Sequence, residues 1–460
     1  MPKDKNKLTA DEIRKLVNSP ESVIHFIGIG GVSMYTLARL AARQGVKVTG
    51  SDRTPSSRTR DLSMRGISVK IGHDSSNIDG ATLVVYSHAI SDTNPELRYA
   101  KNLAIPCVSR PEFMGAMMLA FRSRIGVSGT HGKSTTVAML DLIFSSALCE
   151  PTTLSGADLS IGSPIREGGE DLLLYEACEY RDSFLSFSPS VAVALNLEYD
   201  HPDYFEDIKA LKASFRRAIS RATQFAVVNL DDENLSEIIP EIKSRVVTFG
   251  QSERAEYRYL ITGFFDTGFE FMVYHNKMAI EKFRLNIPGV HNVSNAAAAI
   301  VTALEYGIDA TTVAGAISSY RSISARLELV GSRHGRPVYL DYAHHPKEIQ
   351  ATINTLKLLC RDMLTVVFKP HTYSRTAALW EDFSASLSLA DHIILTDIYP
   401  AREQPIKDIN SRRLAQDIGD RAIFSPDYEV AYCVDNYTSG AIVIMGAGDM
   451  EGIKKDILGR

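Results

Sequence analysis

Short apolar runs recur along the chain, and a glycine or a polar cluster follows each of them. Continuous apolar runs of this length are typical of buried strands in a parallel sheet, and ligands bind in the loops after such strands. Helix-like stretches separate the runs. The pattern therefore predicts an α/β fold with more than one doubly wound sheet. The runs are Val23–Ile27, Lys47–Thr49, Thr82–Tyr86, Arg124–Val127, Leu172–Tyr175, Val191–Leu195, Val338–Leu340, Leu364–Phe368, Ile393–Leu395 and Ala441–Met445.

Two further patterns lie in the middle of the chain. Tyr257–Phe283 alternates apolar and polar residues around glycines, which predicts an antiparallel hairpin near the end of a middle domain. Asn292–Tyr306 and Ala310–Tyr320 have the spacing of amphipathic helices. We predict a linker at Arg110–Pro111 and a second boundary near Ser322–Arg326. The expected domains are residues 1–110, 111–324 and 325–460, and a length of 460 residues agrees with about three domains.

Composition and charge narrow the class of protein. Apolar residues make up 45% and charged residues 23%, as in an ordinary soluble protein, and 50 basic against 55 acidic side chains leave no general basic field for nucleic acid or an anionic membrane. No apolar run approaches the roughly 18 residues of a membrane span. The polar start of the chain lacks a signal-peptide core, and the five cysteines form no C-x-x-C pair. We expect a cytoplasmic protein that binds small molecules.

A first glycine-rich loop, GIGGVS, follows the first predicted strand. Gly28, Gly30 and Gly31 allow a tight turn in which a phosphate rests on the amides of the next helix, and Asp52 follows at the distance of a ribose-binding acid. Ser33 occupies the position of the third glycine of the dinucleotide fingerprint. The loop therefore predicts phosphate binding, while an ordinary turn between a strand and a helix remains the alternative.

A second loop, GTHGKST at residues 129–135, lies between a predicted strand and an apolar helix. Its small residues let backbone amides converge on phosphate oxygens. Lys133 can reach the terminal phosphates, and the hydroxyl of Ser134 can reach magnesium. The full phosphate-loop pattern has glycine where this chain has Val127, so the loop is a shortened variant. The alternative is a chance Gly-Lys-Ser in a turn.

Two polar residues stand at the ends of the next predicted strands. Glu176 follows one strand directly, and His201 closes the segment NLEYDH after the other. A carboxylate and a neutral imidazole beside a phosphate loop could complete a Mg²⁺ shell together with Ser134 and nucleotide oxygens. Taken singly, each residue is more often a solvated loop residue, so the prediction depends on the joint pattern.

With these motifs in order, almost the whole chain resembles the Mur ligases. The Gly-Thr-His-Gly-Lys core is shared with folylpolyglutamate synthetases, whereas DYAHHP and PHTYSRT point to the branch that adds L-alanine and to its relative, the murein-peptide ligase. The resemblance implies a central P-loop ATPase domain between N- and C-terminal Rossmann-like domains. The matching stretches are HFIGIGG (25–31), GTHGKST (129–135), DSFL (182–185), DHPDYF (200–205), GVHNVSNAAAA (289–299), DYAHHPKEI (341–349), PHTYSRT (370–376) and IYPAREQP (398–405).

The resemblance also implies roles for individual residues. Lys133 would contact the ATP phosphates, and Ser134, Glu176 and His201 would surround Mg²⁺. The first loop would bind the UDP of the substrate rather than a dinucleotide, and the third domain would face the reacting carboxylate and the incoming amine. The ATP site would contain Gly129, Thr130, His131, Gly132, Lys133, Ser134, Thr135, Asn292, Asn295, Arg326 and Asp341; the UDP site Gly28, Gly30, Gly31, Ser33 and Asp52; and the reacting face His344, His371 and Arg375.

The implied activity is the ATP-dependent joining of L-alanine to the lactyl carboxylate of UDP-N-acetylmuramate, through an acyl phosphate and with release of ADP and phosphate. The enzyme would act in peptidoglycan precursor synthesis as a monomer or weak homodimer. Three alternatives remain open: a murein-peptide ligase that adds L-Ala-γ-D-Glu-meso-diaminopimelate, a catalytically silent binding or regulatory homologue, and an NAD-dependent oxidoreductase. The oxidoreductase would leave the second glycine-rich loop unexplained.

Several residues depart from the family pattern. Cys178 and Tyr180 stand where acidic and small polar residues are usual, Ala325 replaces a frequent basic neighbour of the hinge arginine, and Arg402 replaces a frequent glycine. Arg216 lies fifteen residues after His201, where several relatives carry a carbamylated lysine. We therefore predict no carbamylation in this chain.

Overall fold

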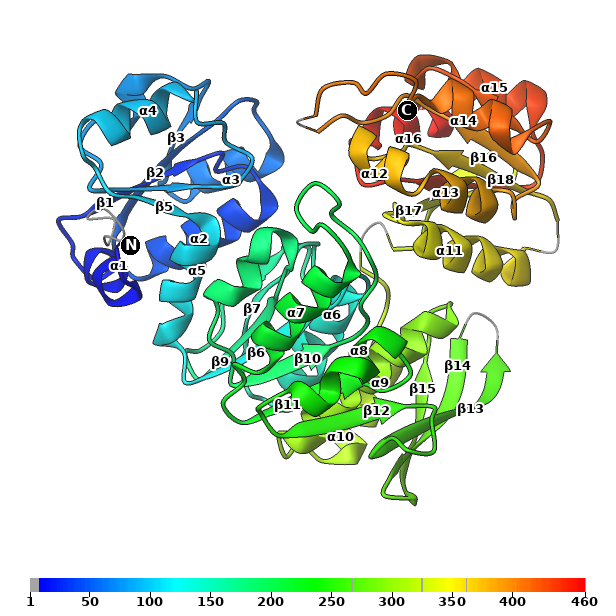
Figure 1. Cartoon of the computed structure of the whole chain (residues 1–460), viewed down its shortest axis with the longest axis horizontal. Helices are drawn as coiled ribbons and strands as arrows, with labels where there is room; N and C mark the ends of the chain where they lie inside the picture. Colours follow the sequence, from blue (N-terminus) through cyan, green and yellow to red (C-terminus); the bar gives the residue numbers. More distant parts are fainter. Residues whose placement is uncertain (1–7, 266–267, 324–325, 361, 402, 460) are drawn as a thin grey trace.

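The fold is known from a computed structural model that describes residues 8–265, 268–323, 326–360, 362–401 and 403–459. Three sheets with their own helices form three domains, and in Figure 1 the N-terminal domain (blue to cyan) and the C-terminal domain (yellow to red) lie on either side above the green central domain. Ala325, Arg402 and the predicted boundary at 324–325 lie outside the described residues. Within the described ranges, every helix is too short or too polar to cross a bilayer.

The N-terminal sheet is parallel, with strand order β3-β2-β1-β4-β5. The chain leaves β1 on one side for β2 and later returns on the other side for β4, so the loop after β1 lies at the switch point where ligands bind in such sheets. The elements are α1 Ala10–Val17, β1 Val23–Ile27, α2 Val32–Arg43, β2 Lys47–Asp52, α3 Ser57–Met64, β3 Ser68–Ile71, η1 Ser75–Ile78, β4 Leu83–Tyr86, α4 Pro95–Asn102, β5 Cys107–Ser109 and α5 Arg110–Met117.

The predicted linker at Arg110–Pro111 is instead the first turn of α5. Ser109 and Glu112 form a capping box, in which the Ser109 amide donates to Glu112 Oε2 over 2.9 Å. Proline suits this position because the first helical amides have no partner within the helix. Phe113 of α5 is fully buried in a core that combines residues of the N-terminal and central domains. The helix therefore connects the two domains through packing as well as through the chain.

The central sheet has the order β15-β14-β13-β12-β11-β10-β6-β9-β7-β8. The predicted hairpin is a three-stranded antiparallel meander, β13 to β15, that extends this sheet because β13 pairs with β12. Strands β9 and β10 flank β6, so their carboxyl ends lie beside the phosphate loop. The strands are β6 Ser123–Ser128, β7 Thr152–Leu154, β8 Ile165–Arg166, β9 Leu172–Glu176, β10 Val191–Ala194, β11 Phe225–Asn229, β12 Val246–Gly250, β13 Tyr257–Phe265, β14 Gly268–His275 and β15 Met278–Leu285.

The helices of the central domain bring a distant part of the chain to the phosphate loop. Helix α9 packs against α6, and the alanines 296–299 on α9 are buried, so little side-chain volume separates the two helices. This packing places Asn292 and Asn295 beside the start of α6. The helices are η2 Met118–Ala120, α6 Lys133–Ser146, η3 Tyr180–Ser186, α7 Ile208–Ile219, α8 Glu233–Ile238, η4 Ile239–Glu241, α9 Val290–Glu305 and α10 Ala310–Ser319.

The C-terminal sheet has the order β16-β17-β21-β18-β19-β20 and is parallel apart from the edge strand β16. Its helix α11 lies on the side that faces the central domain (Figure 1). The predicted α/β fold with a central ATPase domain between two Rossmann-like domains is confirmed. The elements are β16 Glu328–Arg333, β17 Arg336–Asp341, α11 Pro346–Leu359, β18 Leu364–Phe368, α12 Tyr373–Ala378, α13 Trp380–Leu387, β19 His392–Leu395, α14 Ser411–Ile418, β20 Ala422–Phe424, η5 Asp427–Glu429, α15 Val430–Tyr437, β21 Ala441–Met445 and α16 Glu451–Leu458.

Candidate active site

The loop between β6 and α6 has the backbone geometry of a phosphate site. Gly129 (φ 149°) and Gly132 (φ 83°) have positive φ values that residues with a side chain rarely adopt. A Cβ atom at Gly132 would lie 2.3 Å from Asn295 Oδ1, so only glycine lets the loop approach α9 this closely. Helix α6 begins at Lys133, and its free amides and positive dipole end point into the loop. The loop is therefore built to receive an anion.

The Lys133 side chain folds back over this loop. Its Nζ donates to the carbonyl oxygens of Gly129 and Thr130, the latter over 3.1 Å, and lies 3.1 Å from Glu179 Oε2. Burial disfavours the charged amine, but Glu179, Cys178 and Glu176 together outweigh burial and raise the pKa of Lys133. The ammonium group therefore remains charged and is held where terminal phosphates would approach the loop.

Glu179 is a site residue that the sequence analysis missed. It lies in the turn after β9, is 3% exposed, and stands between Lys133 and His201, whose Nε2 is 3.6 Å from Glu179 Oε1. Burial would raise the pKa of Glu179, but the charge of Lys133 lowers it, so the group stays ionised. The only signal in the sequence was its position three residues after Glu176, in a segment without strand or helix periodicity.

The predicted magnesium ligands lie around the same loop. Ser134 is in the first turn of α6, and Glu176 ends β9, where it accepts hydrogen bonds from residues 155–156. His201 has a φ of 58°, an unusual backbone conformation for a residue with a side chain, and its contacts are to Glu179 and to the neighbouring Asp200 rather than to Glu176. Carboxylate and hydroxyl oxygens are the ligands that Mg²⁺ favours. The donors present therefore fit this ion.

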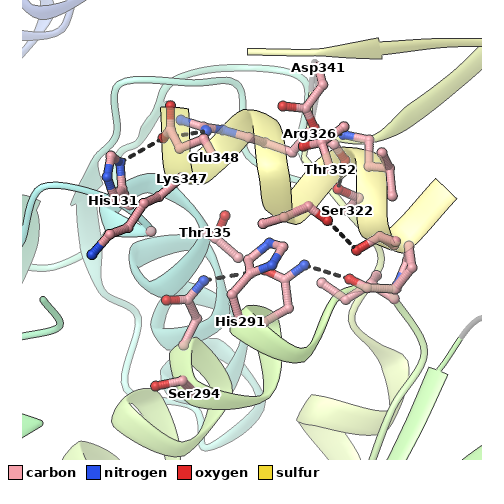
Figure 2. Close-up of a pocket in the computed structure, with 18 of the residues that line it drawn as sticks. His131, Thr135, His291, Ser294, Ser322, Arg326, Asp341, Lys347, Glu348 and Thr352 are labelled. Carbon is pink, nitrogen blue, oxygen red and sulfur yellow. Dashed lines mark hydrogen bonds and ion pairs between the residues drawn. The ribbon is translucent and has the colours of Figure 1, made fainter. Parts of the chain in front are cut away.

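A cavity of about 240 Å³ opens next to the loop, between the central and C-terminal domains (Figure 2). The phosphate loop, α9, the connection into the third domain and α11 all contribute to its wall. The structure thus brings together residues up to 210 positions apart that were predicted to bind ATP: His131, Gly132, Thr135, Asn292, Asn295, Arg326 and Asp341. The other predicted residues Gly129, Thr130, Lys133 and Ser134 belong to the adjoining loop and first turn of α6 rather than to the lining.

Asp341 closes one side of this cavity at the end of β17 (Figure 2). Its carboxylate accepts hydrogen bonds from the amides of Leu327 and Ala343, both over 2.7 Å. Burial raises the pKa of Asp341 to about 6, although the charge of Arg326 opposes this effect. The Arg326 guanidinium lies 5.1 Å from the centre of the Tyr342 ring. A fixed carboxylate of this kind is suited to accept hydrogen bonds from sugar hydroxyls.

Ion pairs join the phosphate loop to the third domain. His131 Nδ1 lies 2.9 Å from Glu348 Oε1 (Figure 2), and Lys347 Nζ lies 2.8 Å from Glu198 Oε1. Burial would lower the pKa of His131, but Glu348 and Glu198 together raise it to about 9. Neither glutamate was predicted. Glu348 is the N3 residue of α11 and accepts the amides of the two preceding histidines, a capping-box position visible in the sequence HHPKE.

The residues predicted for the reacting face form a second buried group. Arg375 is 5% exposed and donates from Nε and Nη2 to the two carboxylate oxygens of Asp200, over 3.0 and 3.1 Å. Its Nη1 lies 3.0 Å from His371 Nδ1, and the His371 ring is 6.1 Å from the His344 ring. The three predicted residues therefore lie together, and they contact the central domain through Asp200, which was not predicted.

Both histidines of this group are neutral at pH 7. Burial lowers the pKa of His344 to about 4. The charge of Glu348 acts in the opposite direction but is the weaker effect. Burial and the charge of Arg375 lower the pKa of His371 to about 3. His344 Nδ1 lies 3.0 Å from the carbonyl oxygen of Tyr342, so it donates there and Nε2 is left as the acceptor. The group thus combines one fixed cation with neutral hydrogen-bonding rings.

The first glycine-rich loop lies in the N-terminal domain at the start of α2. Gly28 has a φ of 80°, and Asp52 Oδ2 accepts the Gly30 amide over 2.8 Å. Arg58 donates to the Gly30 carbonyl oxygen over 3.2 Å. Gly31 is the N-cap residue of α2 and Ser33 lies in its first turn. Asp52 therefore supports the loop backbone in this structure, and the predicted UDP residues remain a prediction.

The departures from the family pattern fall in different surroundings. Tyr180 donates to Asp203 over 2.8 Å, and its ring lies 4.7 Å from the His201 ring, so it packs on a predicted metal ligand. Cys178 is partly buried, and burial raises the pKa of its thiol. Val127 is fully buried in β6, and Arg216 pairs with Glu241 on the surface of α7. Among the departures that the structure describes, Cys178 and Tyr180 are the ones whose side chains lie near the site.

Comparison with known proteins assigns a family to all three domains. Residues 23–122 match the catalytic domain of the Mur ligase family, residues 127–303 match the Mur ligase middle domain, and residues 325–449 match the Mur ligase, glutamate ligase domain. These ranges correspond to the three sheets.

Individual relatives span nearly the whole chain. UDP-N-acetylmuramate–L-alanine ligase of Caldicellulosiruptor bescii is 41% identical over 92% of this chain and 96% of its own length, and the enzyme of the same name from Acetivibrio thermocellus is 40% identical over 93% of each chain. The crystal structure of UDP-N-acetylmuramate-alanine ligase MurC from Thermotoga maritima superimposes with a TM-score of 0.81 at 25% identity, over 95% of this chain and 98% of that one. A murein peptide ligase from Psychrobacter arcticus shares the fold, with a TM-score of 0.73 at 23% identity over 95% and 98% of the two chains. The chain belongs to the Mur ligase family.

Proposed function

We propose that this protein is an ATP-dependent ligase that joins L-alanine to the lactyl carboxylate of UDP-N-acetylmuramate. One observation carries the proposal. The cavity between the second and third domains places a phosphate loop, two asparagines of α9 and Asp341 around one space, as the binding of a nucleoside triphosphate requires. The relatives that match the chain over more than nine-tenths of its length carry this activity in their names.

The chemistry requires an activated carboxylate, because a carboxylate ion is a poor electrophile. The lactyl carboxylate attacks the γ-phosphorus of ATP, the bond to the bridging oxygen breaks, and an acyl phosphate and ADP result. Two anions must approach each other in this step. Lys133 is positioned to neutralise the transferring group, and the amides at the start of α6 would hold the other phosphate oxygens.

Magnesium would be held by Ser134, Glu176 and His201, with the unpredicted Glu179 as a further oxygen donor. When bound, the ion would offset the charge that develops on the phosphate oxygens. The carboxylates of Glu176 and Glu179 approach the loop from the carboxyl end of β9. In the structure Glu179 instead pairs with Lys133, so we expect Lys133 to turn from Glu179 to phosphate when nucleotide binds.

The second step needs an uncharged amine next to the acyl phosphate. The α-amine of L-alanine attacks the carbonyl carbon, phosphate leaves, and the amine loses a proton. Arg375 offers a buried positive charge for the carboxylate or the phosphate. The neutral rings beside it present His344 Nε2 as an acceptor and His371 Nε2 as a donor. Residues of two domains build this region, so closure of the third domain would also exclude water from the acyl phosphate.

The first substrate would bind through its diphosphate to the loop Gly28–Gly31, with Ser33 and Asp52 nearby. Binding at a helix N-terminus at the switch point of a parallel sheet suits a diphosphate without requiring a nicotinamide. We expect the enzyme to act in the cytoplasm on these small molecules, as a monomer or weak homodimer, without nucleic acid or membrane.

A phosphate-release assay tests the proposal. With ATP and Mg²⁺ present, release should require both UDP-N-acetylmuramate and L-alanine, with glycine or serine as weaker substitutes. The tripeptide L-Ala-γ-D-Glu-meso-diaminopimelate should not replace L-alanine, and NADH should neither bind nor be oxidised. Preference for the tripeptide would reassign the chain to murein-peptide ligation, and release without either partner would contradict ligase activity.

A further inference from the structure

Two histidines and a glutamate from different domains converge beside the nucleotide cavity. His131 belongs to the phosphate loop, Glu198 follows β10, and His345 precedes α11 in the third domain. One ligand atom from each lies within 4.8 Å of the others. Glu198 Oε2 is the shared centre, since it is 3.3 Å from His131 Nε2 and 3.6 Å from His345 Nδ1. His131 and Glu198 are 67 positions apart in the sequence, and Glu198 and His345 are 147 positions apart, so no sequence motif predicts this group.

His345 is the member whose chemistry is unexplained. The residue is 5% exposed, and among the described residues neither of its ring nitrogens has a hydrogen-bond partner. Burying two polar nitrogens without partners costs about 1–3 kcal/mol each. The ring lies 4.8 Å from the His131 ring, centroid to centroid, and its Nδ1 faces Glu198. A side chain of this kind, buried and directed at a carboxylate and a second imidazole, has the position of a metal ligand.

The surrounding residues hold two of the three groups in place. His131 Nδ1 lies 2.9 Å from Glu348 Oε1 (Figure 2). This contact leaves His131 Nε2 directed at Glu198. Metal-binding histidines commonly have their second nitrogen against a carboxylate in this way. Lys347 Nζ lies 2.8 Å from Glu198 Oε1, which leaves Oε2 as the single oxygen toward the histidines. Both ligands are therefore oriented, and the ion would displace the proton that His131, with its pKa of about 9, carries on Nε2 at pH 7.

We propose that His131, Glu198 and His345 form a binding site for Zn²⁺ or a similar transition-metal ion that joins the central domain to the C-terminal domain. Bonds of about 2.0–2.2 Å in a tetrahedral site place neighbouring ligand atoms about 3.3–3.6 Å apart. The two separations from Glu198 Oε2 lie in this range, and all three ligand atoms lie within 4.8 Å of one another. Two imidazoles and one carboxylate favour Zn²⁺ over Mg²⁺, and a water molecule would take the fourth position.

The proposed Zn²⁺ site uses other residues than the predicted magnesium site, and an ion bound there would have a different effect on the enzyme. Magnesium would bind on the Lys133 side of the loop, whereas His131 and Glu198 line the nucleotide cavity. An ion held by His345 as well would fix the third domain against the phosphate loop and restrict both nucleotide entry and domain opening. Zn²⁺ should therefore inhibit turnover. This consequence, unlike binding itself, rests on the proposed function.

A second group of similar composition provides a matched control. Glu256, His275 and Glu305 also have ligand atoms within 4.8 Å of one another, away from the cavity. Here the carboxylate of Glu305 is already occupied, since it accepts from Tyr257 OH over 2.8 Å and pairs with Arg245 over 2.9 Å. In addition, His275 Nε2 already lies 3.1 Å from Asn276 Nδ2, whereas His345 has no such partner for either ring nitrogen among the described residues. The control group should not bind the ion.

Metal binding to the intact, metal-free protein tests the site without substrates. Zn²⁺ titrated in competition with a chromophoric chelator should give one tight equivalent for the wild type. His345→Ala should remove it, His275→Ala should retain it, and Glu348→Gln should weaken it about 10- to 100-fold. Co²⁺ should show the intense visible absorption of a tetrahedral site in the wild type and in His275→Ala only. If His345→Ala does not fold, Glu198→Gln provides the same comparison.

The opposite pattern would overturn the proposal: no tight equivalent in the wild type, retention in His345→Ala, or loss in His275→Ala. Activity is a separate measurement. In the presence of excess Mg²⁺, Zn²⁺ should inhibit phosphate release competitively with ATP. If the wild type releases no phosphate with any substrate, the proposed function fails, while the Co²⁺ spectrum still decides whether the metal site exists.

Discussion

The two glycine-rich loops begin alike and differ in what faces them. Each follows a buried strand, uses a glycine with positive φ and opens a helix. The first loop is supported within its own domain, because Asp52 accepts the Gly30 amide. The second contacts residues from three other parts of the chain, since Gly132 abuts α9, Lys133 pairs with Glu179 and His131 pairs with the third domain.

This difference shows what a glycine pattern can establish. The pattern predicts an anion site at both loops, because it describes only backbone freedom and a helix N-terminus. Chemistry depends on the groups opposite the loop. The second loop combines a buried cation, nearby carboxylates and an adjoining cavity, so we expect phosphoryl transfer at this loop. The first loop is equipped to bind and position.

The largest effect should come from Lys133→Ala in the second loop. The change removes the cation beside the terminal phosphates, and the loss of about 3 kcal/mol of transition-state stabilisation should lower kcat/KM more than a hundredfold. The KM for UDP-N-acetylmuramate should change little, because that site belongs to the other loop. Steady-state phosphate release measures both quantities.

A double variant separates chemistry from folding in this experiment. Lys133→Ala leaves the buried Glu179 without the ammonium group that offsets its charge, so the melting temperature should also fall. Adding Glu179→Gln removes the uncompensated charge and should restore the melting temperature without restoring turnover. Near-normal turnover in Lys133→Ala would contradict the phosphate-loop assignment and, with it, the contrast between the loops.

The sequence patterns correctly predicted the strands that are followed by ligand-binding loops. Val23–Ile27 and Leu364–Phe368 have the predicted bounds, because buried parallel strands require continuous apolar residues. Edge strands such as β3 Ser68–Ile71 and β20 Ala422–Phe424 were missed. The interior strand β11 was missed too, although it is fully buried. At Arg110–Pro111 we predicted a linker, because these residues follow a run that would close the first sheet. Proline is also common in the first turn of a helix, and this is the position that Pro111 has in the structure.

The candidate site could be predicted only where residues are adjacent to a strand end or match a family motif. Glu179 and Asp200 belong to the site because of partners that the fold brings near. Glu179 pairs with Lys133, and Asp200 pairs with Arg375, which lies 175 residues later in the chain. No periodicity encodes such a pairing. The same holds for His345, which a sequence pattern would describe as a loop residue before a helix.

An intermediate effect should come from Glu96, which accepts a hydrogen bond from Ser51. The carbonyl oxygen of Ser51 in turn accepts the amides of Gly28 and Ile29 in the first loop. Glu96 is fully buried and accepts from Ser51 Oγ and Asn77 Nδ2, both over 2.6 Å, with His25 Nε2 at 3.5 Å. Burial would raise the pKa of Glu96, but its hydrogen bonds and the charge of His25 lower it to about 2. The ionised group therefore stabilises the fold above about pH 4.5, and this contribution is lost as the pH falls toward 2.

Glu96→Gln should consequently lower the free energy of unfolding by about 2 kcal/mol at pH 7 and by progressively less below pH 4.5. Urea unfolding of both proteins between pH 7 and 3 measures the difference. Turnover at pH 7 and low temperature should remain near normal, because Glu96 lies outside the reacting group. A difference that grows as the pH falls would contradict the assignment of an ionised, stabilising carboxylate.

The smallest effect should come from Asp52, and it decides what the first loop does. Asp52→Ala removes the acceptor of the Gly30 amide and frees a loop that would bind the UDP diphosphate, at a cost of about 1 kcal/mol. The KM for UDP-N-acetylmuramate should rise about fivefold, while kcat and the KM for ATP should stay unchanged. Asp52→Asn is the matched control, since its side-chain oxygen can still accept from Gly30.

If Asp52 only supports the backbone, the asparagine variant should behave almost as the wild type. If both variants raise this KM equally, the carboxylate itself must contact the substrate, and the first loop would then recognise its ligand through a side chain as the second loop does.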